Sequence, residues 1–306
     1  MSVVRVLFSY LIFPGFVFTA VVGLFLTWID RKVTARIHWR VGPPWYQPYA
    51  DFLKLLLKET IIPEGSSKIL FLMGPILGLV AMSIFAVMVF SMNLNPEGTF
   101  VGDLIVMVYL LAIPPLGLMI GGSASKNPLA SVGVSREMTQ YFAYELPFLI
   151  TIAAIILKAG GSVRFGDIIM AQQANGPFLY SISGVIGAIV ILLSTQAKLG
   201  FVPFDIPEAE QEIMAGPYIE YSGVALAMFR VVRAMMLFLL PLFLISVLWG
   251  GFSSWWVILK FLLIVVLIIL IKNTNPRIRI DQSLRFFWLG IGVLSVIGLV
   301  LAVYGL

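Results

Sequence analysis

A passage rich in carboxylates interrupts an otherwise apolar sequence. The stretch PFDIPEAEQEIMAGPYIEYSG, residues 203–223, contains five acidic residues, and no Lys or Arg occurs between Lys198 and Arg230. These acids are Asp205, Glu208, Glu210, Glu212 and Glu220. Carboxylates that lie close together beside a membrane raise one another's pKa by repulsion and burial, which allows proton exchange near neutral pH. The passage therefore indicates a proton or cation pathway. A solvated acidic loop is the alternative, although such loops seldom alternate so closely with Phe, Ile, Met and Ala.

The spacing within this acidic passage predicts short pieces of structure rather than one long helix. Its three prolines each remove a backbone hydrogen-bond donor. We expect Glu208 and Glu212 to share one helical face and Glu210 to lie on another. Arg230 and Arg233, spaced i and i+3 in the next apolar segment, project from one face and could supply the counter-ions that the passage lacks.

Another carboxylate lies within an apolar segment. Glu145 is the eighth residue of the nearly uncharged segment 138–157. An ionisable group at that depth is costly unless it meets a partner or water, so it is a candidate for the ion pathway; a carboxyl satisfied by a nearby Tyr or Arg is the alternative. Arg136 and Glu137 precede the segment, where an interfacial position costs little. We include Glu137 among the ion-pathway candidates, whereas Asp103 is typical of ordinary interface chemistry.

The composition predicts the elements that must hold these residues. The 306 residues are 60% hydrophobic and 11% charged, and the mean hydropathy is +1.03. Because a bilayer-spanning helix needs about 20 apolar residues, we expect an all-α integral membrane protein with eight transmembrane helices in a single membrane domain over residues 1–306. Glycines in the second and third spans indicate close packing. The expected spans are 6–29, 69–92, 104–122, 138–157, 179–197, 221–247, 255–271 and 286–304.

Lys and Arg are distributed unevenly between the loops. The loops after the first, third, fifth and seventh spans hold fourteen of these residues, including Lys198, whereas the other side holds three. The positive-inside bias therefore predicts cytoplasmic odd-numbered loops, with both termini outside. The first span lacks a small-residue cleavage pattern, so we expect it to be retained as a helix.

The first of these loops contains a short amphipathic segment. QPYADFLKLLLKE, residues 47–59, places Asp51, Lys54 and Lys58 at i, i+3 and i+7 among apolar residues. It is too short to span a bilayer, so we expect a cytoplasmic helix lying in the membrane interface. A membrane-surface anchor and a lateral wall beside an opening are both compatible with this pattern.

The residue inventory excludes several kinds of chemistry. With no cysteine and with His38 as its only histidine, the chain cannot hold cysteine-ligated iron–sulfur clusters or build a histidine metal site. We expect no bound cofactor or metal and no catalytic residue on this chain, so redox centres would belong to other subunits. There is no basic stripe for nucleic acid, no nucleotide-binding glycine loop and no nucleophile elbow.

Four ordered motifs resemble a known family over nearly the whole chain. They are DRKVTARIHWRVGPPWYQPYADFLKLLLKE (30–59), GGSASKNPLASVGVSREMTQYFAYELP (121–147), VPFDIPEAEQEIMAGPYIEYSG (202–223) and NPRIRIDQSLRFFW (275–288). The sequence resembles the H-type membrane subunit of respiratory complex I and its relatives in membrane-bound, energy-converting (group 4) hydrogenases and ferredoxin-linked reductases.

The resemblance implies an eight-helix subunit that docks a hydrophilic redox arm on the membrane arm and links electron transfer to ion pumping. It implies that Glu208, Glu210, Glu212 and Glu220 line the junction between the arms, and that Glu145 continues the pathway inward. Asp205 falls on the Asp of the PFD motif. The implied positioning partners are Arg36, Arg40 and Arg136.

Two departures from the complex I pattern refine this expectation. Asp30 stands where complex I chains usually have Glu, and the GPPWYQP stretch is short. The short form resembles the hydrogenase-related branch, whose members use ferredoxin and need no quinone. The leading hypothesis is therefore a coupling subunit of a ferredoxin-linked membrane-bound hydrogenase or related reductase. The alternatives are a quinone-chamber subunit of NADH:quinone oxidoreductase (complex I) and an independent cation carrier.

The leading hypothesis also implies partners. They are a hydrophilic hydrogenase-like large subunit, iron–sulfur subunits and antiporter-like membrane subunits, with ferredoxin as the donor for the whole complex. Iron–sulfur clusters, and a NiFe site in the hydrogenase case, would lie in those partners. The terminal acceptor and the choice between H⁺ and Na⁺ stay open. Glu145→Gln is expected to impair ion pumping more than assembly or electron transfer.

Overall fold

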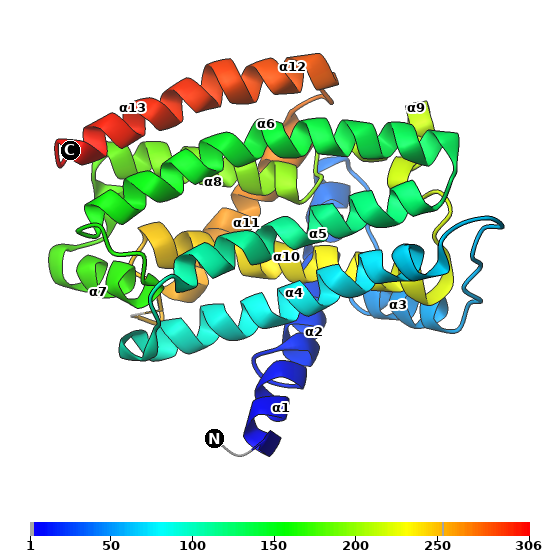
Figure 1. The fold of residues 1–306 in the computed structure, drawn as a ribbon, viewed down its shortest axis with the longest axis horizontal. Coiled ribbons are helices and arrows are strands. Elements are labelled where there is room, and N and C mark those ends of the chain that lie inside the picture. The colour runs from blue at the N-terminus through cyan, green and yellow to red at the C-terminus, as the bar shows by residue number, and fades with distance from the viewer. Residues whose placement is uncertain (1–2, 253) are drawn as a thin grey trace.

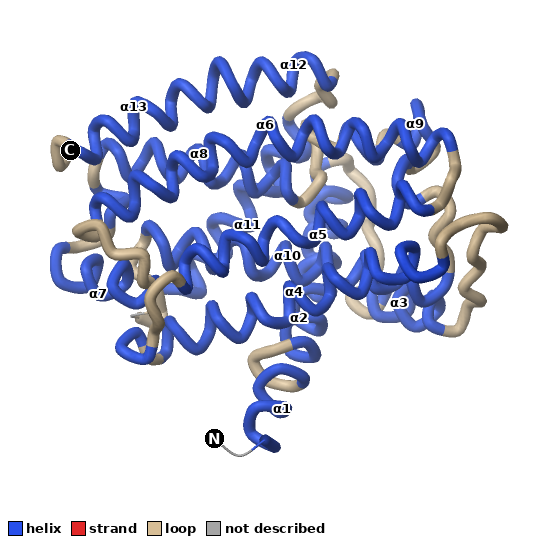
Figure 2. The backbone as a smooth tube through the Cα atoms, viewed as in Figure 1, coloured by secondary structure: helices blue, strands red, loops and turns tan. Residues whose placement is uncertain are grey.

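Helices form all of the regular structure in the described part of the chain. The computed structural model describes residues 3–252 and 254–306, and these ranges contain no strand (Figure 2). Most of the long helices run alongside one another, while the N-terminal pair α1 (Val3–Leu11) and α2 (Phe16–Ile37) crosses them (Figure 1). The predicted all-α fold is confirmed.

Eight apolar segments are present, as predicted. Within the described residues, seven are long and apolar enough to cross a membrane, and the eighth, α8 (Ile182–Lys198), is shorter at 17 residues. The chain is therefore a multi-pass membrane protein. Besides α8 and the α1–α2 pair, the segments are α4 (Lys68–Leu94), α5 (Asp103–Ala124), α6 (Pro128–Lys158), α10 (Gly223–Leu248), α11 (Val257–Thr274) and the pair α12 (Ile280–Arg285) and α13 (Gly292–Val303).

The first predicted span differs from the observed helix at both ends. It was expected to be continuous over 6–29, but the helix is interrupted around Pro14, which has no amide hydrogen to donate. After the break, α2 continues past the predicted end to Ile37. Its charged residue Asp30 stays helical because it is buried and accepts a hydrogen bond from Lys272 Nζ at 2.6 Å.

The fourth span begins ten residues earlier than the predicted start at 138. Asn127 caps α6 by accepting a hydrogen bond from the backbone N–H of Leu129 at 2.8 Å, and Pro128 occupies the first helical position, where its missing N–H costs little. Arg136 and Glu137 therefore lie within the helix. The last span also begins early, and a π-helical turn, η5 (Phe286–Ile291), joins its two parts.

Helix α10 is the centre of the bundle. Almost every residue from Val231 to Leu248 is buried, and α2, α4, α8 and α11 pack around it. The outer helices instead expose many large apolar side chains. This pattern suits a helix bundle whose outer faces meet lipid.

Glycines allow α4 and α5 to pack at close range, as predicted. A Cβ atom built on Gly74 would lie 2.5 Å from the carbonyl oxygen of Gly117, and one on Gly117 would lie 2.5 Å from that of Gly74. Since both contacts are with backbone, a side chain at either position would force the helices apart.

Gly74→Ala is therefore expected to destabilise the protein by about 1–3 kcal/mol through overpacking. The thermal midpoint of the purified protein would report the loss. Gly290→Ala is the matched control, since a Cβ atom there has nothing within 4 Å. Equal midpoints for the two variants would contradict the close contact.

Short elements gather at the two ends of the bundle. The amphipathic segment forms α3 (Gln47–Leu56), which confirms the predicted short helix, while its position in a membrane interface stays a prediction. Figure 1 places α3 and α9 (Glu210–Ile213) at one end, called here the charged end, and α7 (Phe165–Asn175) with the C-terminus at the other. The remaining short turns are η1 (Pro96–Gly98), η2 (Phe178–Tyr180), η3 (Ile206–Glu208) and η4 (Gly216–Tyr218).

Candidate functional site

The acidic passage folds as three short turns, η3, α9 and η4. The prediction that Glu208 and Glu212 share a helical face was wrong, because Ala209 between them has a ψ of 92° and ends the first turn. The expected absence of one long helix is confirmed. Between α9 and η4, Met214 and Ala215 adopt positive φ angles of 50° and 75°. Such backbone is costly for residues with side chains, so surrounding contacts must hold this turn in place.

A cavity of about 840 Å³ opens at the charged end between α2, α3, α10 and the acidic passage. Acidic and basic side chains line it in equal numbers, six of each. The acids are Asp30, Asp51, Asp205, Glu208, Glu210 and Glu212. The bases are Arg31, Arg230, Arg233, Lys272, Arg277 and Arg279. Basic side chains from other segments therefore balance the negative charge of the passage in the folded structure, although the passage itself contains none.

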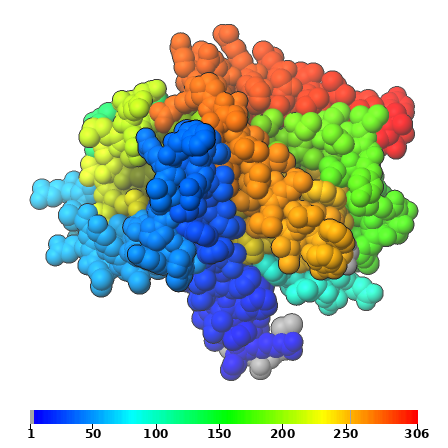
Figure 3. All heavy atoms as spheres, turned by 180° about the vertical axis from the view of Figure 1, so that it is seen from behind, coloured from blue at the N-terminus to red at the C-terminus, as the bar shows by residue number. Residues whose placement is uncertain are grey.

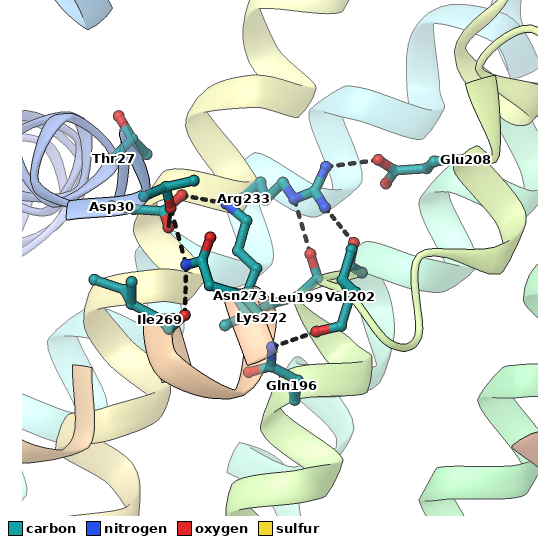
Figure 4. Close-up of polar contacts among 12 residues, drawn as sticks. Thr27, Asp30, Gln196, Leu199, Val202, Glu208, Arg233, Ile269, Lys272 and Asn273 are labelled. Atoms are coloured by element: carbon teal, nitrogen blue, oxygen red, sulfur yellow. Dashed lines mark hydrogen bonds and ion pairs between the residues drawn. The ribbon is translucent and has the colours of Figure 1, made fainter. Parts of the chain in front are cut away.

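Arg233 fixes the start of the acidic passage to α10. Its Nη1 donates to Glu208 Oε2 at 2.6 Å, its Nε to the carbonyl oxygen of Leu199 at 2.8 Å, and its Nη2 to that of Gly200 at 2.6 Å (Figure 4). The guanidinium also lies 5.1 Å from the ring centroid of Phe201. The prediction that Arg233 supplies a counter-ion to the passage is confirmed.

Two further arginines reach the passage from distant segments. Arg277, between α11 and α12, donates to both carboxylate oxygens of Asp205 at 2.8 and 2.5 Å. This hydrogen-bonded pairing raises the pKa of Arg277 above its usual value. Arg136, on α6, donates to Glu212 Oε2 at 2.6 Å. In the sequence, only the family resemblance indicates Arg136, and no argument singles out Arg277.

The wall formed by α2 and α3 is held by polar contacts. Arg31 on α2 donates to Asp51 on α3 at 2.9 Å, and Gln47 donates to the same carboxylate at 2.9 Å. Partial burial alone would raise the pKa of Asp51, but these hydrogen bonds outweigh it and hold the pKa below its usual value. On the other side α2 lies against α11 (Figure 3), where Asp30 pairs with Lys272.

Glu145 is paired deep in the bundle with a residue that sequence reasoning missed. Lys198, the last residue of α8, donates through Nζ to Glu145 Oε2, and the two side chains are 1% and 10% exposed. The ammonium also lies 4.9 Å and 4.6 Å from the ring centroids of Tyr144 and Phe148. The assignment of Lys198 to a loop was wrong. No local pattern in the sequence indicates this pairing.

A second, smaller chamber lies between the cavity and this pair. Its volume is about 40 Å³, and its polar lining is Glu137, Lys198, Glu208, Tyr218 and Arg233. Glu137 is partly buried and forms no hydrogen bond or ion pair with another described residue. Burial, reinforced by the nearby charge of Glu208, raises the pKa of Tyr218 well above its usual value, so this phenol stays protonated.

Comparison with known proteins decides the family. The sequence model of the NADH dehydrogenase family matches residues 10–303. The chain is 33% identical over 290 residues to the H-type subunit of NADH-quinone oxidoreductase from Brevibacillus brevis, covering 88% of this chain and 85% of that protein. The chain belongs to the NADH dehydrogenase family.

A solved structure supports the same assignment. A chain of the membrane-bound sulfane sulfur reductase, an archaeal respiratory membrane complex, superposes on this member of the NADH dehydrogenase family with a TM-score of 0.82. The two are 31% identical, and the match covers 94% of this chain and 96% of the other. This NADH dehydrogenase family chain is accordingly an H-type subunit of a respiratory membrane complex related to complex I.

Several predicted residues of this NADH dehydrogenase family member lie at the edge of the site or outside it. Glu220 lies outside the cavity lining and accepts a hydrogen bond from Asn127 Nδ2 at 2.6 Å. Arg36 and Arg40 are exposed and pair with no acid of the described chain.

Two other predicted residues line the cavity without an ion-pair partner. Glu210 and Arg230 are exposed at its wall and form no ion pair with a described residue. Of the predicted residues, Glu145, Glu208 and Arg233 are thus paired within the bundle, Glu137 is partly buried without a partner among the described residues, and Glu210 and Arg230 are exposed.

The site consists mainly of carboxylates and the cations that pair with them. Across residues 3–252 and 254–306, no group of three or more His, Cys, Asp and Glu side chains could hold a metal ion. The fold places a series of carboxylates between the exposed end of the bundle and its interior. Most of them are paired with cations. Such pairs can exchange protons when a neighbouring charge changes.

Proposed function

We propose that this H-type subunit docks the hydrophilic redox module of a ferredoxin-linked reductase or membrane-bound hydrogenase and couples its electron transfer to ion translocation. One observation carries the proposal. Charged groups continue from the exposed cavity through Glu208 and Arg233 into the inner chamber, and from there to the buried pair of Glu145 and Lys198. Buried charges of this kind are costly to keep in a membrane protein, so a role in ion movement explains them better than stability does.

The exposed residues of the charged end would receive the redox module. Glu210 and Glu212 lie at the open side of the cavity, and Arg36 and Arg40 are free to contact a partner. A change of charge on a cluster above them would alter the proton affinity of the carboxylates below. We assign the ion pathway to Asp205, Glu137, Glu145, Glu208, Glu210, Glu212 and Glu220, positioned by Arg136, Arg230 and Arg233.

The lining of the cavity favours the ferredoxin-linked branch over a quinone chamber. Twelve of its 23 lining residues are charged, whereas sites for apolar cofactors are lined mainly by apolar and aromatic side chains. The similarity to the sulfane sulfur reductase chain extends over 94% of this chain. The name of the Brevibacillus relative keeps a quinone-chamber subunit as the second candidate. An independent cation carrier would leave the similarity to a subunit of a respiratory complex unexplained.

The remaining parts of the proposal concern the partners. Iron–sulfur clusters, and a NiFe site in the hydrogenase case, would lie in hydrophilic partner subunits, with no redox centre on this chain. Antiporter-like membrane subunits would continue the membrane arm. The charged end would face the cytoplasm, in keeping with the predicted positive-inside orientation.

The test is an activity assay on the complex purified from its native membranes and on sealed inverted vesicles. We expect reduced ferredoxin to drive reduction of protons or of a sulfur compound and to build an ion gradient. NADH oxidation that depends on quinone, without ferredoxin activity, would overturn the branch assignment. Ferredoxin oxidation without any gradient would overturn coupling.

A further inference from the structure

The inner chamber holds an uneven set of charges. Three carboxylates, Glu137, Glu145 and Glu208, lie at or next to it, together with two cations, Lys198 and Arg233. Glu208 is paired with Arg233 and Glu145 with Lys198, which leaves Glu137 without a partner among the described residues. An unpaired carboxylate away from bulk water is most stable as the neutral acid. Glu137 is thus placed to hold a proton.

Lys198 lies next to both the paired and the unpaired glutamate of α6. Its Nζ donates to Glu145, while its side chain lines the same chamber as Glu137. The two glutamates lie eight residues apart on α6, which corresponds to about 12 Å along a helix axis. A lysine has a flexible stem and three rotatable donors, and it can lose its proton when buried. These properties suit it to bridge the two acids.

We propose that Lys198 relays protons between Glu137 and Glu145, an inference that rests on the proposed function. The ammonium of Lys198 gives one proton to the Glu145 carboxylate, so that a neutral amine faces a neutral acid. The amine then takes the proton of Glu137, which becomes a carboxylate. One proton has moved from Glu137 to Glu145, Lys198 is an ammonium again, and no electron has moved.

The same geometry assigns the transported ion at this point as H⁺ rather than Na⁺. In the chamber of about 40 Å³, Lys198 and Arg233 already pair with Glu145 and Glu208, which leaves only the Glu137 carboxylate to bind a metal cation. Across the described ranges, no group of three or more His, Cys, Asp and Glu side chains is arranged to hold a metal ion. A proton instead needs only one carrier, and the Lys198 amine lines the chamber with Glu137 and donates to Glu145.

The alternative role for Lys198 is only to neutralise the charge of Glu145. Three variants of the whole complex distinguish this role from a proton relay. Lys198→Arg keeps the positive charge but cannot be deprotonated in a protein. Glu145→Gln combined with Lys198→Met removes both charges. Lys198→Met alone leaves a buried carboxylate without its partner. The readouts are the amount of assembled complex and the ions pumped per electron in sealed vesicles.

A relay predicts that Lys198→Arg and the double variant assemble but pump at least about tenfold fewer ions per electron, the scale of a lost acid–base group. Lys198→Met alone should also assemble poorly. Neutralisation alone predicts that Lys198→Arg regains both assembly and pumping, and this result would overturn the relay. The double variant is the control for assembly, because it also removes Glu145 from the pathway. If the wild-type vesicles build no gradient, the proposed function fails whatever the variants do.

Infrared difference spectra of the reduced and oxidised complex test the identity of the ion. We expect a carboxyl protonation change that persists when Na⁺ is replaced by K⁺ and disappears in Glu137→Gln. A change that requires Na⁺, or its complete absence in the wild type, would overturn the proton assignment. This readout does not depend on sealed vesicles.

Discussion

Arg233→Met is expected to detach the start of the acidic passage from α10 and to destabilise the assembled complex. The change leaves Glu208 and the carbonyl oxygens of Leu199 and Gly200 without their donor. The cost should be about 2–4 kcal/mol, somewhat below that of breaking a fully buried pair because the site faces a cavity. The midpoint of thermal disassembly of the purified complex measures it.

Arg230→Met provides a matched control for stability. It lies one turn away on the same helix and lines the same cavity, but it is exposed and forms no ion pair with a described residue. Its midpoint should stay close to that of the wild type. The midpoint of Arg233→Lys should lie between those of Arg233→Met and the wild type, because an ammonium keeps the charge but not the planar array of donors of the guanidinium. Equal midpoints for Arg233→Met and Arg230→Met would show that the hydrogen bonds of Arg233 do not hold the passage.

Glu145→Gln is expected to lower ion pumping per electron by at least about tenfold. The amide keeps the volume of the side chain and can still accept the hydrogen bond from Lys198, but it cannot take up a proton. Assembly should also weaken, contrary to the expectation from sequence, because Lys198 is buried and loses its counter-ion. Pumping and electron transfer are measured together in sealed inverted vesicles.

Glu97→Gln is the control for this change, since Glu97 is an exposed carboxylate in η1, outside the cavity and the chamber. It should leave the ratio of ions to electrons at the wild-type value. Should Glu145→Gln also keep that ratio, Glu145 would have only a structural role.

The number of apolar segments was predictable, while several of their boundaries were not. A run of about 20 apolar residues identifies a span because few other structures bury so much apolar surface. The length of the apolar run gives the wrong helix boundary where a charged residue remains helical. Asp30 continues α2 because Lys272 pairs with it, and Arg136 and Glu137 lie within α6 rather than before it. Only the three-dimensional structure shows such partners.

The candidate site was also predictable only in part. Its acids stand out in the sequence because five of them lie close together in an apolar chain. The cations of these acids come mostly from elsewhere: Arg136 is 76 residues from Glu212, and Arg277 is 72 residues from Asp205. Arg233 could be predicted because it lies in the helix that follows the passage. Lys198 could not, since no local pattern links the end of α8 to the middle of α6.

The central claim is that the carboxylates at the charged end respond to a redox event in a neighbouring subunit and pass charge toward Glu145. A structure of the whole assembled complex tests it most directly. The account predicts a cluster-bearing hydrophilic subunit seated over Glu210 and Glu212, with polar groups or ordered water continuing to Glu145. Finding these glutamates in bulk solvent, distant from every cluster-bearing subunit, would contradict it.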